Sequence, residues 1–123
     1  MRLLVVEDDS KVAGFLEQGF QEEGFEVEVA RDGLGAYALG REGTFDLILL
    51  DYMLPGQDGP AVVGALRRDG VQTPVLMLTA RDDPRDIRTA MEAGADGYIT
   101  KPFRFDDLLD RIQALLTARR LFT

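Results

Sequence analysis

Polar side chains follow several short apolar runs in this sequence, each at the point where the run ends. They comprise carboxylates, a hydroxyl and an ammonium group, at Glu7, Asp8, Asp51, Thr79 and Lys101. Carboxylates that folding brings together repel one another unless a cation or a shared proton relieves them. Magnesium prefers carboxylate oxygens together with waters and phosphate oxygens. This set of residue types is therefore typical of a metal-assisted phosphoryl-transfer site.

A carboxylate can attack a phosphoryl group despite its own charge when a divalent ion is bound beside it. Asp51 is the candidate nucleophile, and Glu7 and Asp8 would share the ion with it. Lys101 would neutralise oxygens of the transferring group, and Thr79 would donate a hydrogen bond to another. We expect the ion to be Mg2+, for which Mn2+ could substitute.

Composition restricts the kinds of site that this chain can build. The 123 residues include no Cys and no His, which removes thiol nucleophiles, imidazole bases and the usual zinc ligands. A formal net charge of -8 argues against direct binding of nucleic acid, because that affinity depends on clustered Lys and Arg. No apolar run is long enough to span a bilayer, and no leader precedes the first run. We expect one soluble, cytoplasmic domain.

Short apolar runs alternate with longer amphipathic stretches, which predicts five strand–helix units around a buried parallel sheet. Only the second run alternates with glutamates, which favours an edge strand. The predicted strands are Leu3–Val6, Glu26–Ala30, Leu47–Leu50, Val75–Leu78 and Tyr98–Thr100. Ligands of such sheets bind beyond the carboxyl ends of the strands, so we expect the polar side chains to share one edge.

Apolar residues at helical spacing predict the five helices between these strands. Val12, Phe15, Leu16 and Phe20 define the first, with Ser10 as its N-cap. The others are predicted at Ala36–Leu39, Ala61–Leu66, Ile87–Met91 and Leu108–Leu116. Glycines stand where helices must end, at Gly24, Gly43, Gly70 and Gly94. The aromatic side chains assigned to the core are Phe15, Phe20, Phe45 and Phe103.

Four segments match a known family, in an order and at spacings that fit the five units. They are Val5–Asp9, Asp46–Gly56, Met77–Arg81 and Gly94–Phe103. Through them the chain resembles the receiver domains of bacterial two-component response regulators along nearly all of its length. The resemblance implies one receiver domain over residues 1–123, with a doubly wound, flavodoxin-like or CheY-like sandwich of five parallel strands in the order 2-1-3-4-5.

The resemblance also implies a role for each acid. Asp51 would be the phosphoacceptor, and Glu7 and Asp8 the acidic pair. The main-chain carbonyl of Met53 would complete the protein ligands of Mg2+. Met53 and Arg81 each lie two residues beyond a site residue, at positions that in this family tune how fast the phosphoryl group hydrolyses.

Thr79 and Tyr98 resemble the family's switch pair. The hydroxyl would move toward the phosphoryl group while the aromatic ring turns inward. Lys101 would contact the phosphoryl oxygens, and its bond to Pro102 is expected to be cis.

The sequence is most similar to the branch that carries a winged-helix DNA-binding domain after the receiver. Members of that branch pair through the fourth helix, fifth strand and fifth helix. Asp96, Asp107 and Arg111 fit its charged face, but Gly97 stands where an acid is usual and Ile87 where a basic residue is usual. Exposed ion pairs contribute only about 0 to 1 kcal/mol each, so apolar contacts would have to support a homodimer of altered geometry.

The resemblance implies a regulatory phosphoacceptor rather than an enzyme. Its phosphodonor would be a sensor histidine kinase, and the domain would contact DNA only through a C-terminal domain that this chain lacks. A freestanding receiver that acts as a protein-interaction module is the alternative within the family.

Two other classes of protein fit the sequence less well. A phosphatase of the haloacid dehalogenase type needs a second aspartate two positions after the nucleophile, where this chain has Met53. A flavin-binding module would need amides and hydroxyls around the flavin phosphate, whereas the loop after the first strand is acidic.

Overall fold

A computed structural model describes residues 1–80 and 83–121, with side chains described as far as Arg119. Strands and helices alternate throughout these residues. The strands are β1 (Arg2–Val6), β2 (Glu26–Ala30), β3 (Leu47–Asp51), β4 (Val75–Thr79) and β5 (Gly97–Thr100). The helices are α1 (Ser10–Glu22), α2 (Gly33–Gly40), α3 (Gly59–Arg68), α4 (Pro84–Ala93) and α5 (Phe105–Leu121). None of the described helices is both long and apolar enough to cross a membrane.

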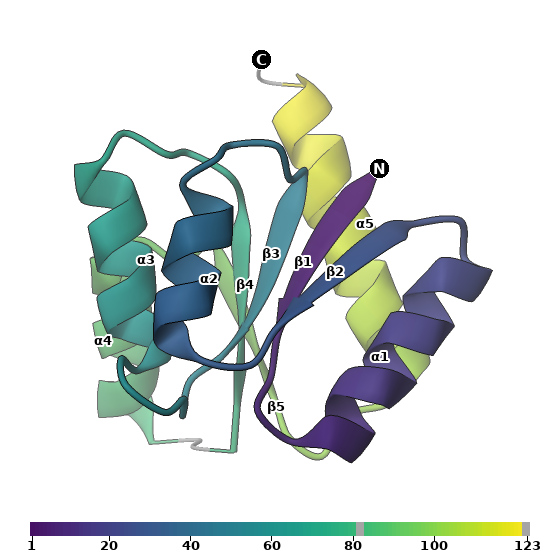
Figure 1. Cartoon of the computed structure of the whole chain (residues 1–123), viewed down its shortest axis with the longest axis horizontal. Coiled ribbons are helices and arrows are strands. Elements are labelled where there is room, and N and C mark those ends of the chain that lie inside the picture. The colour runs from purple at the N-terminus through teal and green to yellow at the C-terminus, as the bar shows by residue number, and fades with distance from the viewer. Residues whose placement is uncertain (81–82, 122–123) are drawn as a thin grey trace.

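The strands form one parallel sheet in the order β2-β1-β3-β4-β5, which confirms the predicted fold and places β2 at an edge. Helices α1 and α5 cover one face, and α2, α3 and α4 cover the other (Figure 1). Val6 of β1 pairs with Leu50 of β3, and Asp51 pairs with Leu78 of β4. The carboxyl ends of the central strands therefore lie side by side.

The core has one apolar layer on each face of the sheet. Leu3 and Val5 point toward α1 and α5, whereas Leu4 and Val6 point toward α2 and α3, and all are fully buried. Strands covered on both faces need continuous apolar runs, which is the pattern that β1, β3 and β4 show. The sheet is therefore a rigid frame for the side chains at its edge.

One aromatic residue was wrongly assigned to the core. Phe15 is 57% exposed, because it lies beside rather than on the buried stripe of α1 formed by Ala13, Leu16 and Phe20. Its ring meets Phe105 edge to face at a centroid distance of 6.0 Å. Of the other aromatic residues assigned to the core, Phe20 and Phe45 are buried and Phe103 is half-buried.

The predicted N-cap of the first helix is also wrong. Asp9 caps α1, because its Oδ1 accepts hydrogen bonds from the amides of Lys11 at 2.9 Å and Val12 at 3.2 Å. Ser10 is instead the first helical residue. Aspartates with extended backbone likewise precede α2, α3 and α4, at Asp32, Asp58 and Asp83. These caps explain why the helices begin earlier than their apolar residues predicted.

Glycine lets α3 begin directly against the end of β3. A Cβ atom at Gly59 would lie 2.8 Å from the main-chain oxygen of Asp51 and 2.7 Å from Sδ of Met77. The amide of Gly59 donates to the carbonyl of Tyr52 at 2.8 Å. Any larger residue would push α3 away from the strand that carries Asp51.

Candidate functional site

Three carboxylates from two neighbouring strands meet at the carboxyl edge of the sheet. Glu7 follows β1 and Asp51 ends β3, and the pairing of Val6 with Leu50 sets them beside each other. With Asp8 they form a group in which one oxygen from each residue lies within 4.8 Å of the others. The sequence-predicted acids are thus brought together.

Lys101 reaches this cluster from β5, across the intervening strand β4. Its Nζ atom lies 2.8 Å from Oε1 of Glu7 and 3.1 Å from Oδ2 of Asp51. The amide of Lys101 donates to the carbonyl of Thr79 at 2.7 Å, and the bond to Pro102 is cis. One ammonium group therefore bridges both buried acids of the cluster.

Burial divides the acids into two kinds. Glu7 is 1% exposed and Asp51 is 5% exposed, whereas Asp8 faces solvent. Burial raises the pKa of Glu7, and the neighbouring Asp51 carboxylate raises it further, which outweighs the lowering by Lys101. The cluster thus holds more negative charge than one ammonium group compensates.

The same contacts act on the ammonium group in opposite directions. Burial lowers the pKa of Lys101, but its hydrogen bond to Glu7 and the charge of Asp51 raise it more, so the pKa lies above its ordinary value. Lys101 is therefore a permanent cation at neutral pH.

The chemistry of the cluster fits a hard divalent cation. Its donors are all oxygens, they carry excess negative charge, and Asp8 opens the cluster to solvent. Magnesium usually keeps several waters and takes few carboxylates, which suits a site that is buried on one side only. The acidic cluster could therefore hold a metal ion.

Met53 lies close to Asp51 through its main chain. Its amide donates to Oδ1 of Asp51 at 3.4 Å, while its side chain is 53% exposed. The carbonyl of Met53 as a metal ligand stays a prediction, as does its side chain in tuning hydrolysis. The other predicted rate-tuning residue, Arg81, lies outside the described residues.

The predicted switch residues lie on the same face of the sheet. Thr79 ends β4 with 2% exposure, and Tyr98 on β5 pairs with Met77, two residues earlier on β4. Side chains alternate along a strand, so Thr79 and Met77 point the same way, toward the core layer that Tyr98 joins. A coupled movement of this pair stays a prediction.

The predicted dimer residues differ in their contacts within the chain. The carboxylate of Asp96 accepts from Arg67 at 3.0 Å and from the amide of Val75 at 2.8 Å. Asp107 and Arg111 instead line a cavity of about 460 Å³ beside Ile99. Asp96 is thus engaged inside its own chain, as is Arg111, whose Nη1 donates to the main-chain oxygen of Tyr98 at 2.9 Å.

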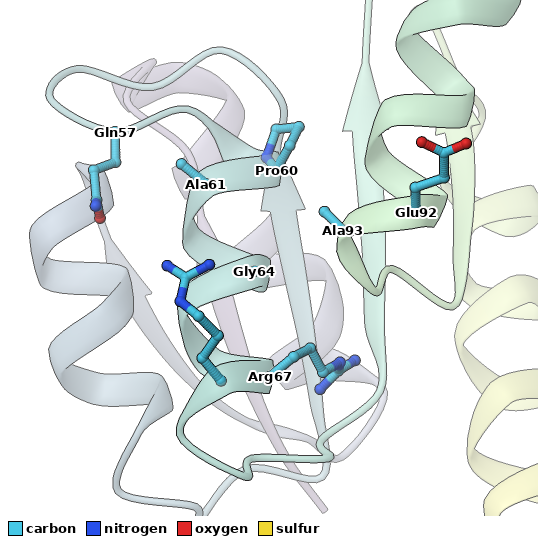
Figure 2. A pocket seen from close by; sticks show the side chains of 8 residues that line it. Gln57, Pro60, Ala61, Gly64, Arg67, Glu92 and Ala93 are labelled. Atoms are coloured by element: carbon cyan, nitrogen blue, oxygen red, sulfur yellow. The ribbon is translucent and has the colours of Figure 1, made fainter.

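A second cavity, of about 610 Å³, lies between α3 and α4. Figure 2 shows Arg67 extending from the last turn of α3 toward the side on which α4 lies. Its guanidinium group donates to the carbonyls of Gly94, Val71 and Thr73. Because this cavity gathers no group of acids comparable to the cluster, the carboxyl edge of the sheet is the better candidate site.

Sequence reasoning missed Arg31, which follows β2 at the same edge of the sheet. Its Nη2 donates to the main-chain oxygen of Asp8 and to Oγ of Ser10, both at 2.7 Å. Its place directly after a strand is a usable signal, because polar residues at that position in parallel sheets share the edge where ligands bind.

Comparison with known proteins agrees with this geometry. Residues 3–113 match the response regulator receiver domain family. The transcriptional regulatory protein PcoR of Escherichia coli is 46% identical over 122 residues, which cover 97% of this chain and 53% of PcoR. CusR, a transcriptional regulatory protein of Escherichia coli K12, is 43% identical over 116 residues, which cover 94% and 51%.

A solved structure of the Francisella response regulator 1452 receiver domain superposes with a TM-score of 0.90 at 36% identity. The match covers 96% of this chain and 98% of that one. This chain spans about half the length of the two curated relatives. It belongs to the response regulator receiver domain family, the receiver domains of two-component systems.

Proposed function

We propose that the chain accepts one phosphoryl group on Asp51 from a phosphohistidine of a sensor histidine kinase. The observation that carries this proposal is the cluster of Glu7, Asp8 and Asp51 around the ammonium group of Lys101. Mg2+, or Mn2+ in its place, is the proposed cofactor. The role is regulatory, and the chain would assist only its own phosphorylation and dephosphorylation.

Each residue has a defined task in this transfer. An oxygen of Asp51 forms the bond to phosphorus as the phosphorus–nitrogen bond of the donor breaks and the imidazole leaves. A bound Mg2+ would supply positive charge to the transferring oxygens. Glu7 and Asp8, with the carbonyl of Met53, would hold the ion. Lys101, already beside Asp51, turns from a carboxylate toward the new phosphoryl oxygens.

Phosphorylation would then shift an equilibrium between two conformers. Thr79 donates to a phosphoryl oxygen, and Tyr98 turns into the space that opens on the same face of the sheet. Their common face supports this coupling. The change would be read at α4 and β5.

We further propose a transcriptional output in the cytoplasm. The names of PcoR and CusR describe transcriptional regulators, and this chain spans about half of each. A winged-helix domain beyond the chain would bind DNA. A homodimer would form through α4, β5 and α5, with Asp107 and Arg111 at the contact. The ion pair with Arg67 makes Asp96 less available than that face requires.

Intact mass after incubation with Mg2+ and acetyl phosphate tests the acceptor. The wild-type chain should gain one phosphoryl group, and Asp51→Asn should gain none. Chelation of the metal should abolish the gain, and Asp106→Asn, an exposed acid in the first turn of α5, is the matched control. Full phosphorylation of Asp51→Asn would refute the assignment.

A second experiment separates the acceptor from the switch. Thr79→Ala should still gain mass, but its backbone amide resonances in α4 and β5 should shift much less on phosphorylation than in the wild type. Equal shifts in both proteins would refute the role of Thr79 and leave that of Asp51 intact.

A further inference from the structure

Arg31 fastens the end of β2 to the loop that carries Asp8. Its Nη2 donates to the main-chain oxygen of Asp8 and to Oγ of Ser10, each at 2.7 Å. A third bond joins the same two segments, because the amide of Glu7 donates to the carbonyl of Ala30 at 3.0 Å. The loop after β1 is thus held from outside as well as by its own helix cap.

Asp8 depends on this support more than the other acids do. Glu7 and Asp51 are buried and bridged by Lys101. Asp8 is exposed, and within the described residues its carboxylate has no hydrogen bond or ion pair. The direction of its side chain is therefore set by the main chain, whose carbonyl Arg31 holds.

We propose that Arg31 is a positioning residue of the metal site, which fixes the loop at Asp8 so that its carboxylate meets those of Glu7 and Asp51. The proposal rests on the proposed function, because it takes the acidic cluster to bind Mg2+. Groups that orient metal ligands in this way commonly change metal affinity by about 10- to 100-fold when removed.

The charge of Arg31 and its hydrogen bond to the loop predict opposite changes in Mg2+ affinity when the side chain is removed. A guanidinium group near a cation site repels the cation, so its removal should tighten Mg2+ binding if charge alone matters. Loss of the hydrogen bond to the carbonyl of Asp8 should instead weaken binding. The sign of the change in Arg31→Ala therefore decides between the two.

Isothermal titration of the unphosphorylated chain with Mg2+ is the primary measurement. Arg31→Ala should weaken binding by about 10-fold, while the rate of phosphorylation by acetyl phosphate at saturating Mg2+ stays within about twofold of the wild type. Arg88→Ala, which removes an exposed arginine from α4, is the charge control and should bind Mg2+ like the wild type.

Two further variants separate positioning from general loosening. Ser10→Ala keeps the arginine and its bond to the carbonyl of Asp8, so it should weaken binding less than Arg31→Ala does. In an Asp8→Asn background, Arg31→Ala should add no further loss of affinity, because the ligand that it orients is already impaired. A full additive loss in that background would overturn the proposal.

The outcomes separate this proposal from the proposed function. If the wild-type chain binds no Mg2+, both are overturned. If the wild type binds Mg2+ and Arg31→Ala binds it equally well or more tightly, only the role of Arg31 is overturned. Circular dichroism of each variant establishes that it is folded before titration.

Discussion

Two half-buried cations, Lys101 and Arg67, bridge distant segments at opposite edges of the sheet. Their side chains are almost equally exposed, at 25% and 23%, yet their partners differ. Lys101 binds the carboxylates of Glu7 and Asp51. Arg67 binds main-chain carbonyls at the ends of α3 and α4 and before β4, with Asp96 as its one acidic partner among the described residues.

The difference between carbonyl and carboxylate partners determines which of the two cations can change its contacts when a metal ion or a proton binds. Main-chain carbonyls neither take up protons nor offer the charge that would draw a metal ion away from solvent, so the bonds of Arg67 to these carbonyls should not change with pH or metal. Carboxylates can exchange an ammonium group for a divalent ion or a proton. The Lys101 cluster is therefore a site whose contacts change, and the Arg67 cluster a fixed brace between α3, β4 and α4.

Removal of the brace should have the largest effect on stability. Arg67→Ala leaves three partly buried carbonyls without this donor, which should lower the free energy of unfolding by about 3 kcal/mol. Mg2+ affinity should stay unchanged. Urea denaturation measures the first and calorimetry the second. Arg68→Ala, the exposed neighbour on α3, should change stability by less than about 0.5 kcal/mol. A large loss of Mg2+ affinity in Arg67→Ala would break the comparison.

Removal of Lys101 should lower stability less than removal of Arg67 does, and it should increase the affinity for Mg2+. Lys101→Ala leaves two buried acids unpaired, but they can bind a proton instead, so the loss should be about 1 to 2 kcal/mol at neutral pH. Without the competing cation, Mg2+ should bind more tightly, and saturating Mg2+ should restore much of the lost stability. The variant should nevertheless switch poorly after phosphorylation. Thermal unfolding with and without Mg2+ measures the restoration, and weaker Mg2+ binding would contradict it.

The smallest expected effect is a dependence of stability on pH that Glu7 of the Lys101 cluster produces. Burial raises the pKa of Glu7, so the folded chain holds this proton more tightly than the unfolded chain. The contribution of Glu7 to the free energy of unfolding should be full below its ordinary pKa and fall as pH rises through the raised pKa.

Comparison with Glu7→Gln isolates that contribution in urea titrations between about pH 4 and pH 8. Mg2+ affinity should rise with pH over the same window, because only ionised Glu7 binds the metal. In an Arg67→Ala background, the difference between the profiles of Glu7 and Gln at position 7 should stay the same. If the free energy of unfolding depends on pH identically in the wild type and in Glu7→Gln, the proposed contribution of Glu7 is wrong.

The positions of the strands and of the acids could be predicted because each depends on local patterns. Continuous apolar runs identify strands buried on both faces, and the carboxyl ends of parallel strands must share an edge. Glu7 and Asp51 follow two such runs and do meet.

Other features depend on contacts that a sequence pattern does not specify. Phe15 has helical spacing but lies off the buried stripe, and Asp9 rather than the predicted Ser10 caps α1, because the backbone is extended at Asp9. The hydrogen bond from Arg67 to the carboxylate of Asp96 joins residues 29 positions apart. Arg31 reaches a carbonyl 23 positions away. Such long-range bonds leave no periodic trace in the sequence.

The last helix returns to the edge of the sheet where the strands begin. Arg119 donates to the main-chain oxygen of Asp46, just before β3, and Figure 1 shows α5 ending at the pole from which β1 starts. A helix of 17 residues spans about 25 Å at 1.5 Å per residue. A domain joined to its end would therefore be attached at the edge of the sheet opposite Asp51, and a change at Asp51 would have to cross the height of the sheet to reach that attachment.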